Sequence, residues 1–173
     1  AGREVCNLPI LASMTFTRDD RTLLGDTPEK IAQSIFEVGA NIIGINCSGG
    51  PAQLLRILKR MKRAIPNGIF SVMPNAGWPE ESNGRILYPA GADYFGDYAL
   101  AFRNEGASFI GGCCGTTPDH IHAMSQALAS TPKADYKAEA FPNIVKAQDQ
   151  IPVSEKKSAL AERLKKGKFS IAV

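Results

Sequence analysis

Two cysteine-containing segments carry the chemistry that this sequence is equipped for. Cys113 and Cys114 lie side by side with glycines on both sides, and Cys47 ends an apolar run that leads into Gly49-Gly50. Each segment is typical of a strand that ends in cysteine and continues into a glycine turn. Three thiolates at strand ends make a metal site with three protein ligands, whereas zinc prefers four. The sequence therefore predicts a zinc site with an open, catalytic position.

The paired cysteines need a turn to reach one ion. Neighbouring side chains of a regular strand point to opposite faces, so Cys113 and Cys114 meet at one metal only where the strand stops. Glycines at 111, 112 and 115 permit such a turn. Two alternatives stay open at this point: ordinary buried cysteines, and a strained disulfide between Cys113 and Cys114.

Apolar runs alternate with amphipathic segments along most of the chain. We expect strands at 8–16, 41–47, 69–73 and 107–114, and helices at 27–39, from 51 onward, at 92–105 and at 117–129. This βαβαβαβα order predicts an α/β fold of parallel strands with helices outside, which amounts to half of a (β/α)₈ barrel. Cys47, Asn75, Cys113 and Cys114 then fall at carboxyl ends of strands, where such barrels hold their active sites. A flavodoxin-like open sheet is the structural alternative.

Finer expectations concern packing. The run 8–16 suits a strand buried on both faces, and Ile31, Ile35 and Val38 form an apolar helix stripe. The basic face of the helix that starts at Pro51 is expected to be a solvated surface, and the loop 78–89 is long enough to be functional. His120 and His122 are expected on the surface, and Cys6 is expected to be an ordinary free cysteine. Trp78 is expected either to cover the cysteine site or to pack against the rim of the barrel.

Composition sets the class of protein. The 173 residues are 44% hydrophobic and 21% charged, which suits an ordinary globular domain. A net charge of +3 with scattered basic residues gives no reason to expect nucleic-acid or membrane binding. No apolar run reaches the roughly 20 residues of a membrane span, and no signal peptide is recognisable. Four cysteines make no disulfide framework, so a reducing, cytoplasmic location is expected.

Three motifs together resemble the homocysteine S-methyltransferase family. They are Gly44-Ile45-Asn46-Cys47, Met73-Pro74-Asn75-Ala76-Gly77 and Gly111-Gly112-Cys113-Cys114-Gly115-Thr116. The resemblance covers residues 8–129 and implies strands five to eight, the second half, of that family's TIM barrel, with the domain at 1–130. It implies zinc as cofactor, held by Cys47, Cys113 and Cys114. Asn75 matches an asparagine close to the metal, and Asn46 and Asn75 are candidate substrate-binding residues, with loop capping as the alternative for both.

The rest of the chain is expected to lead into another domain. Residues 131–153 have the composition of a linker, and Ser158 to Val173 resembles the opening of a methylenetetrahydrofolate reductase barrel. That pairing is similar to bacterial bifunctional proteins. It implies that residues 154–173 are the start of a following domain, and that FAD belongs to the part of that domain absent from this chain. The family's first four strands, with their glycine-rich loop and acidic residues, are also absent. We therefore expect a fragment that is inactive alone, with open sheet edges that favour self-association.

The resemblance implies transfer of a methyl group to the thiol of homocysteine, which gives methionine. The methyl donor stays open among methyltetrahydrofolate, methylcobalamin, S-methylmethionine and betaine. Two rival functions also stay open. One is a structural zinc or redox-thiol module without catalysis, and the other is a barrel enzyme with a cysteine nucleophile, although neither histidine sits at a strand end.

Overall fold

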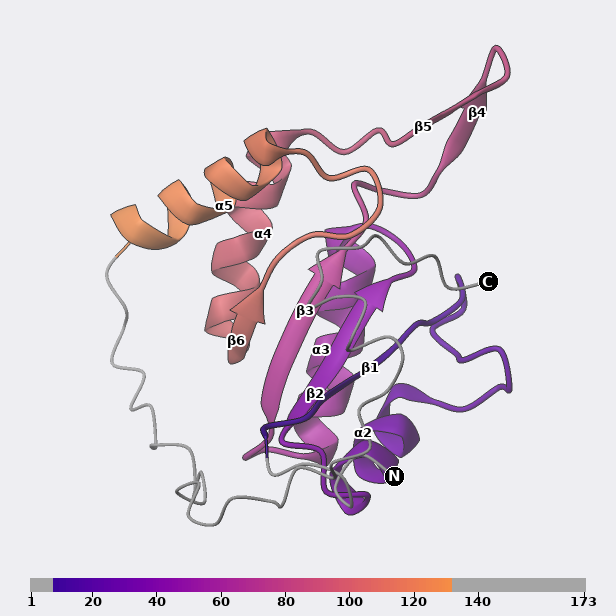
Figure 1. Ribbon diagram of the computed structural model, residues 1–173, viewed down its shortest axis with the longest axis vertical. Coiled ribbons are helices and arrows are strands. Elements are labelled where there is room, and N and C mark those ends of the chain that lie inside the picture. Colours follow the sequence, from indigo (N-terminus) through magenta and orange to yellow (C-terminus); the bar gives the residue numbers. More distant parts are fainter. Residues whose placement is uncertain (1–7, 132–173) are drawn as a thin grey trace, which may run out of the picture. The chain divides into compact units, whose positions relative to one another are not determined.

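The computed structural model describes residues 8–131, which fold as alternating strands and helices (Figure 1). Cys6, the predicted linker beyond residue 131 and the predicted start of a further domain lie outside the described residues. The elements in chain order are β1 Leu11–Met14, α2 Pro28–Glu37, β2 Ile42–Cys47, α3 Pro51–Ala64, β3 Ile69–Pro74, β4 Glu80–Ser82, β5 Arg85–Leu87, α4 Ala92–Asn104, β6 Ala107–Ile110 and α5 Pro118–Ser130. No helix among them is long and apolar enough to cross a membrane.

Four of the strands form one parallel sheet in the order β1-β2-β3-β6. The β2–β3 register runs from Ile42 opposite Ile69 to Cys47 opposite Pro74, and the β3–β6 pairing shifts once, between Phe70 and Ser71. The prediction of an α/β fold with parallel strands is therefore confirmed. Parallel pairing places the carboxyl ends of all four strands at one edge of the sheet.

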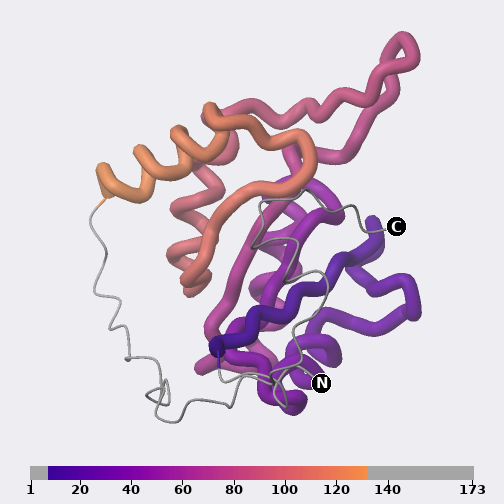
Figure 2. Tube along the Cα trace, viewed as in Figure 1, coloured from indigo at the N-terminus to yellow at the C-terminus, as the bar shows by residue number. Residues whose placement is uncertain are grey.

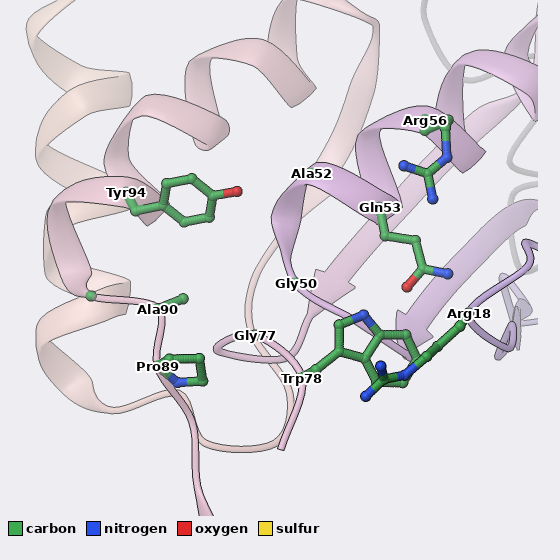
Figure 3. A pocket seen from close by; sticks show the side chains of 11 residues that line it. Arg18, Gly50, Ala52, Gln53, Arg56, Gly77, Trp78, Pro89, Ala90 and Tyr94 are labelled. Carbon is green, nitrogen blue, oxygen red and sulfur yellow. The ribbon is translucent and has the colours of Figure 1, made fainter. Parts of the chain in front are cut away.

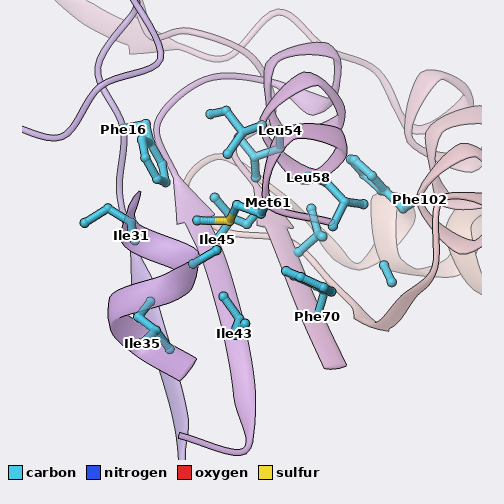
Figure 4. Packing of buried hydrophobic residues seen from close by; sticks show 14 residues of the cluster. Phe16, Ile31, Ile35, Ile43, Ile45, Leu54, Leu58, Met61, Phe70 and Phe102 are labelled. Carbon is cyan, nitrogen blue, oxygen red and sulfur yellow. The ribbon is translucent and has the colours of Figure 1, made fainter. Parts of the chain in front are cut away.

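The core lies between one face of the sheet and the helices α2 and α3 (Figure 4). Alternate residues of β2 and β3 point into it, and they meet an apolar stripe of α3. Each fully buried side chain of this size contributes about 1.5–3 kcal/mol. The largest buried residues of the cluster are Phe16, Ile43, Ile45, Leu54, Ile57, Leu58, Met61, Phe70, Val72 and Phe102. A smaller cluster joins α4 to α5 through Phe95, Ala99 and Met124.

The first strand differs from its prediction. β1 is an edge strand of the sheet, and only Ala12 and Met14 pack against the core. Leu11 is 41% exposed, so the expectation of burial on both faces is wrong. The apolar run failed as a guide because, within the described residues, helices cover only one face of this sheet. Val38 is also outside its predicted stripe: it is the C-cap of α2 and is 73% exposed.

Both helices that follow a Thr-Pro-acid sequence begin where predicted. The Thr27 hydroxyl accepts a hydrogen bond from the Lys30 backbone amide at the start of α2. Thr117 is the N-cap of α5 and forms a capping box with His120. These caps fix the first turns of α2, which packs against α3 and β2, and of α5, which packs against α4.

The loop 78–89 contains a β-hairpin that the sequence analysis did not predict. Strands β4 and β5 pair antiparallel around Asn83 and Gly84, which both have positive φ angles, 51° and 73°. Asn-Gly with two positive φ values is the preferred turn of two-residue hairpins, so the signal was present in the sequence. The hairpin projects away from the rest of the described chain (Figure 2), and all its strand residues are exposed.

The basic face of α3 is only partly a solvated surface. Arg56 forms a two-point ion pair with Asp20, and Arg60 forms one with Glu29. Both acids lie in or next to the long β1–α2 connection, so the pairs tie that connection and α2 to α3. Hydrogen bonds from Arg60 lower the pKa of Glu29 from its ordinary value of 4.5 to about 2.

This pair predicts a measurable effect of acid on stability. A carboxyl with a depressed folded-state pKa stabilises the fold above pH 4.5, and the contribution is lost as pH falls toward about 2. We expect Glu29→Gln to lower the free energy of unfolding at pH 7 by about 1 kcal/mol or less, because the pair is partly exposed. The difference from wild type should shrink between pH 4.5 and 2 in urea titrations. A difference that is constant across this range would contradict the assignment.

Candidate metal centre

Cys47 sits where β2 ends in an unusual backbone conformation. Cys47 and Ser48 both have positive φ, 61° and 63°. Such angles are strained in residues other than glycine and persist only where surrounding contacts hold them. The Ser48 hydroxyl accepts a hydrogen bond from the Phe16 backbone amide at 2.7 Å, and the Gly49 carbonyl accepts one from the Asn75 amide at 3.1 Å. The turn therefore holds its shape through bonds to the ends of β1 and β3.

Cys113 and Cys114 lie on a turn, because β6 ends at Ile110 rather than at residue 114 as predicted. The Cys113 amide donates to the Pro74 carbonyl at 2.8 Å, and the Thr116 hydroxyl closes the turn onto the Cys113 carbonyl at 2.7 Å. Gly115 completes the turn with a φ of 76°. This early end of the strand is what allows two neighbouring side chains to face one point.

The three sulfur atoms form one cluster. The Sγ atom of Cys114 lies 3.8 Å from that of Cys47 and 3.9 Å from that of Cys113, and all three lie within 4.8 Å of one another. A tetrahedral zinc ion with Zn–S distances of about 2.3 Å requires sulfur ligands roughly 3.8 Å apart. Soft thiolates are also the ligands that suit zinc. The donor set and its spacing therefore fit zinc, and all three cysteines are free thiols.

Asn75 joins the two cysteine turns. Its side-chain amide donates to the Ser48 carbonyl at 2.9 Å, and its carbonyl oxygen accepts from the Cys114 amide at 3.0 Å. The next amide, of Ala76, donates to the Cys114 carbonyl at 2.9 Å. Asn75 is only 4% exposed, and its bond to the Ser48 carbonyl is buried, whereas its bond from the Cys114 amide is partly buried. The loop-bridging interpretation of Asn75 is seen directly, and contact with substrate stays a prediction.

Asn46 precedes Cys47 on β2 and is half-buried. Its backbone carbonyl accepts a hydrogen bond from the Thr15 hydroxyl at 3.3 Å. Because Ile45 is fully buried in the core, the Asn46 side chain points to the opposite face of the sheet. Its predicted role toward substrate likewise stays a prediction.

Ionisation is unequal within the cluster. Burial raises the pKa of the Cys47 thiol, but hydrogen bonds from Asn75, from Cys114 and from the Ser48 backbone amide hold it below the ordinary value of 9.0. Hydrogen bonds with Cys47 and Cys113 raise the pKa of Cys114. Cys47 therefore becomes a thiolate before Cys114 does. Full deprotonation of the cluster needs a cation.

Tyr88 is a neighbour of the cluster that the sequence analysis missed. Partial burial, the nearby Cys114 charge and a hydrogen bond with the Cys114 thiol all raise the pKa of this tyrosine. Thr116 and Ser48 were also missed. A residue's contact with a cysteine from a distant loop leaves no local sequence pattern, which is why Tyr88 escaped notice.

The other candidates lie away from the sulfurs. His120 is buried rather than on the surface: one ring nitrogen lies 2.9 Å from the Ala90 carbonyl oxygen, and the other joins the α5 capping box. The prediction of a surface residue failed because α5 packs its first turn against the segment before α4. His122 is exposed, as predicted.

Trp78 lines a cavity of about 620 Å³ between the first turns of α3 and α4. The Arg18 guanidinium lies over its ring, 4.6 Å from the centroid, and Gln53 points toward the same space (Figure 3). None of the three cysteines lines this cavity. Trp78 therefore packs beside the Cys47 turn and does not cover the sulfurs.

Comparison with known proteins agrees with this geometry. Residues 1–128 match the family model for homocysteine S-methyltransferase, so the chain belongs to that family. It is 32% identical over 163 residues to methionine synthase of Mycobacterium tuberculosis and 32% identical over 168 residues to that of Mycobacterium leprae. Each match covers 92% of this chain but only 13% of the relative. A crystal structure of an isomerase from Streptomyces coelicolor A3(2) matches 70% of this chain and 31% of its own, with 21% identity and a TM-score of 0.45.

The bridging role of Asn75 predicts a large loss of stability on truncation. Asn75→Ala removes the partners of the buried Ser48 carbonyl and of the partly buried Cys114 amide, each worth about 1–3 kcal/mol or less. We therefore expect the free energy of unfolding to fall by roughly 2–5 kcal/mol in urea titrations. Asn75→Asp is the matched control: it keeps the acceptor for the Cys114 amide and should lose less than the alanine variant at a pH where the carboxyl is ionised. Equal stability of Asn75→Ala and wild type would show that the bridge contributes nothing.

Proposed function

We propose that this chain supplies the zinc-binding part of a homocysteine S-methyltransferase, with Cys47, Cys113 and Cys114 as the metal ligands. The observation that carries the proposal is the cluster of three sulfurs, two of whose separations are 3.8 and 3.9 Å. Membership of the family supports homocysteine as the substrate and methionine as the product. Methyltetrahydrofolate, methylcobalamin and S-methylmethionine are the candidate methyl donors.

The chemistry follows from the charge of the ligand set. Bound zinc supplies the Lewis acidity that lowers the pKa of the homocysteine thiol, so that its thiolate exists at neutral pH. The three cysteine thiolates carry one more negative charge than zinc carries positive charge. Three neutral histidines would leave the substrate sulfur electron-poor, whereas this set leaves it electron-rich. The substrate sulfur attacks the donor's methyl carbon in line, and the leaving group keeps the bonding electrons.

The two asparagines have distinct proposed roles. Asn75 holds the Cys47 turn and the Cys113–Cys114 turn at a fixed separation, and it helps to hold the pKa of Cys47 below its ordinary value, which favours the thiolate there. Asn46 points to the sheet face that helices leave uncovered among the described residues, and we assign it a contact with homocysteine. In both roles the group beside the sulfur is a neutral side-chain amide, which does not titrate.

The uncovered sheet face supports the assignment to a barrel half. It is lined by Ser13, Gly44 and Ser71 in one layer, with Leu11 and Phe109 partly exposed. Strands β1 and β6 are the two edges of the described sheet, and both are open to pairing. Four further strands would close the sheet into an eight-stranded barrel and cover that face. We assign the described strands to positions five to eight of such a barrel, with the domain at 1–130, a linker at 131–153 and a reductase-like domain that starts at 154–173.

Zinc content tests the proposal directly. We expect about one zinc per chain in the purified, reduced protein and a loss of most of it in Cys113→Ser, because two thiolates and a hydroxyl bind zinc far more weakly. Cys6→Ser is the matched control, since Cys6 belongs to none of the motifs. Metal content measured by atomic emission, beside a count of free thiols, separates the zinc site from a redox-thiol module.

If the wild-type chain binds no zinc, zinc content is measured again on a longer chain that holds all eight strands of the proposed barrel. There, the zinc-loaded protein should form methionine from homocysteine and one of the three donors, and Cys113→Ser should not. A second absence of zinc would end the proposal. Zinc without methionine formation from any donor would favour a structural zinc site.

A further inference from the structure

Gln53, at the start of α3, has a buried carbonyl oxygen that no protein donor satisfies. The residue is 6% exposed and lines the cavity of about 620 Å³ between α3 and α4. Its side-chain amide donates to the Thr17 carbonyl at 2.7 Å and to an Asp20 carboxylate oxygen at 3.0 Å, so two acceptors fix its orientation. Within residues 8–131, the oxygen Oε1 accepts no hydrogen bond. Buried acceptors nearly always have a donor, so this oxygen indicates a donor on a bound molecule.

The unpartnered oxygen lies beside the indole of Trp78. A Cβ atom added at Gly49 would lie 2.3 Å from Oε1 of Gln53 and 2.7 Å from Nε1 of Trp78. Figure 3 shows the oxygen turned toward the space beside Gly50 and Trp78. A hydroxyl group that enters here as the half-buried indole shifts aside can donate to the glutamine oxygen and accept from the indole N–H.

The wall around this oxygen favours negative charge. Arg18 and Arg56 line the cavity, and no aspartate or glutamate of the described residues does. Arg56 is paired with Asp20, whereas Arg18 forms no ion pair within the described part of the chain and stacks on Trp78. The first turn of α3 lines the cavity as well and contains no acidic residue. Because a helix N-terminus carries partial positive charge, this side of the cavity suits an anion.

The first turn of α4 forms the opposite wall. Gly91 and Tyr94 line the cavity there, but Asp93 in the same turn already carries a negative charge. The anionic group of a ligand therefore belongs on the α3 side, and the tyrosine ring offers an apolar surface to the remainder of the molecule. The volume of the cavity is in the range of sites for small organic molecules.

We propose that this cavity binds a small anion that carries a hydroxyl group. The anionic end lies against Arg18 and the first turn of α3, and the hydroxyl donates to Oε1 of Gln53. Phosphate esters and carboxylates share this chemistry. None of the three cysteines lines the cavity, so binding here does not require the proposed metal.

Two matched pairs of probes test the ligand chemistry on the full chain. Glycerol 3-phosphate is compared with propyl phosphate, and glycerate with propionate; the second member of each pair lacks only the hydroxyls. Binding is followed by the fluorescence of Trp78, the single tryptophan of the sequence. We expect the hydroxylated member of at least one pair to bind about two- to tenfold more tightly, as one added hydrogen bond predicts.

The pair that binds more tightly identifies the anionic group as phosphate or carboxylate. Equal affinities within both pairs overturn the proposal, and so does the absence of saturable binding by all four probes.

Arg18→Gln tests the anionic end of the site. We expect it to weaken binding of the hydroxylated probe about three- to tenfold, because a charged donor is lost. Arg63→Gln is the matched control: it removes the same charge from the last turn of α3, far from the cavity, and should bind like wild type. An equal loss in both variants, or no loss in Arg18→Gln, overturns the placement of the anion.

Gln53→Met tests the hydroxyl contact, because methionine fills similar space without an acceptor of comparable strength. Folding of the variant is checked by circular dichroism. The folded variant should still bind the anions but should no longer prefer the hydroxylated member of a pair. A preference that persists overturns the role of Gln53. If the variant does not fold, the paired probes on the wild-type chain decide.

Discussion

Parallel pairing of β2, β3 and β6 is the constraint on which the sulfur cluster depends. The pairing puts Cys47 opposite Pro74, and the Pro74 carbonyl accepts the amide of Cys113. The last residue of β3 thus sets the position of both cysteine turns. Because parallel strands end at one edge, residues far apart in sequence meet there. A slip of one residue in either pairing would point the sulfurs to opposite faces.

The site combines strain with polar support. Two consecutive residues, Cys47 and Ser48, adopt left-handed backbone angles, and hydrogen bonds from the segments that follow β1 and β3 hold them there. The apolar core beneath contributes most of the stability of the domain, while the polar links decide where the sulfurs point. Two of the buried polar residues, Ser48 and Asn75, accordingly lie beside the cysteine turns.

Much of this arrangement was predictable from the sequence, and the failures have physical causes. The alternation of apolar runs and capped helices predicted the parallel sheet, and the glycines around Cys113 and Cys114 predicted a turn that lets both sulfurs face one point. The exposure of β1 was missed because an apolar run does not say what covers it. The capping role of His120 and the contact of Tyr88 with the Cys114 turn were missed because both depend on residues distant in sequence. The hairpin was missed although Asn83-Gly84 signalled it.

Asn75 and backbone amides link the two cysteine turns, beside the contact between the Cys47 and Cys114 sulfurs, and none of these links involves a metal. Small zinc domains, by contrast, are unfolded until the ion binds, so their metal affinity includes the free energy of folding. Here an arriving ion meets turns that are already in place. The fold of the described residues should then depend less on an ion at the proposed site than the fold of a small zinc domain does.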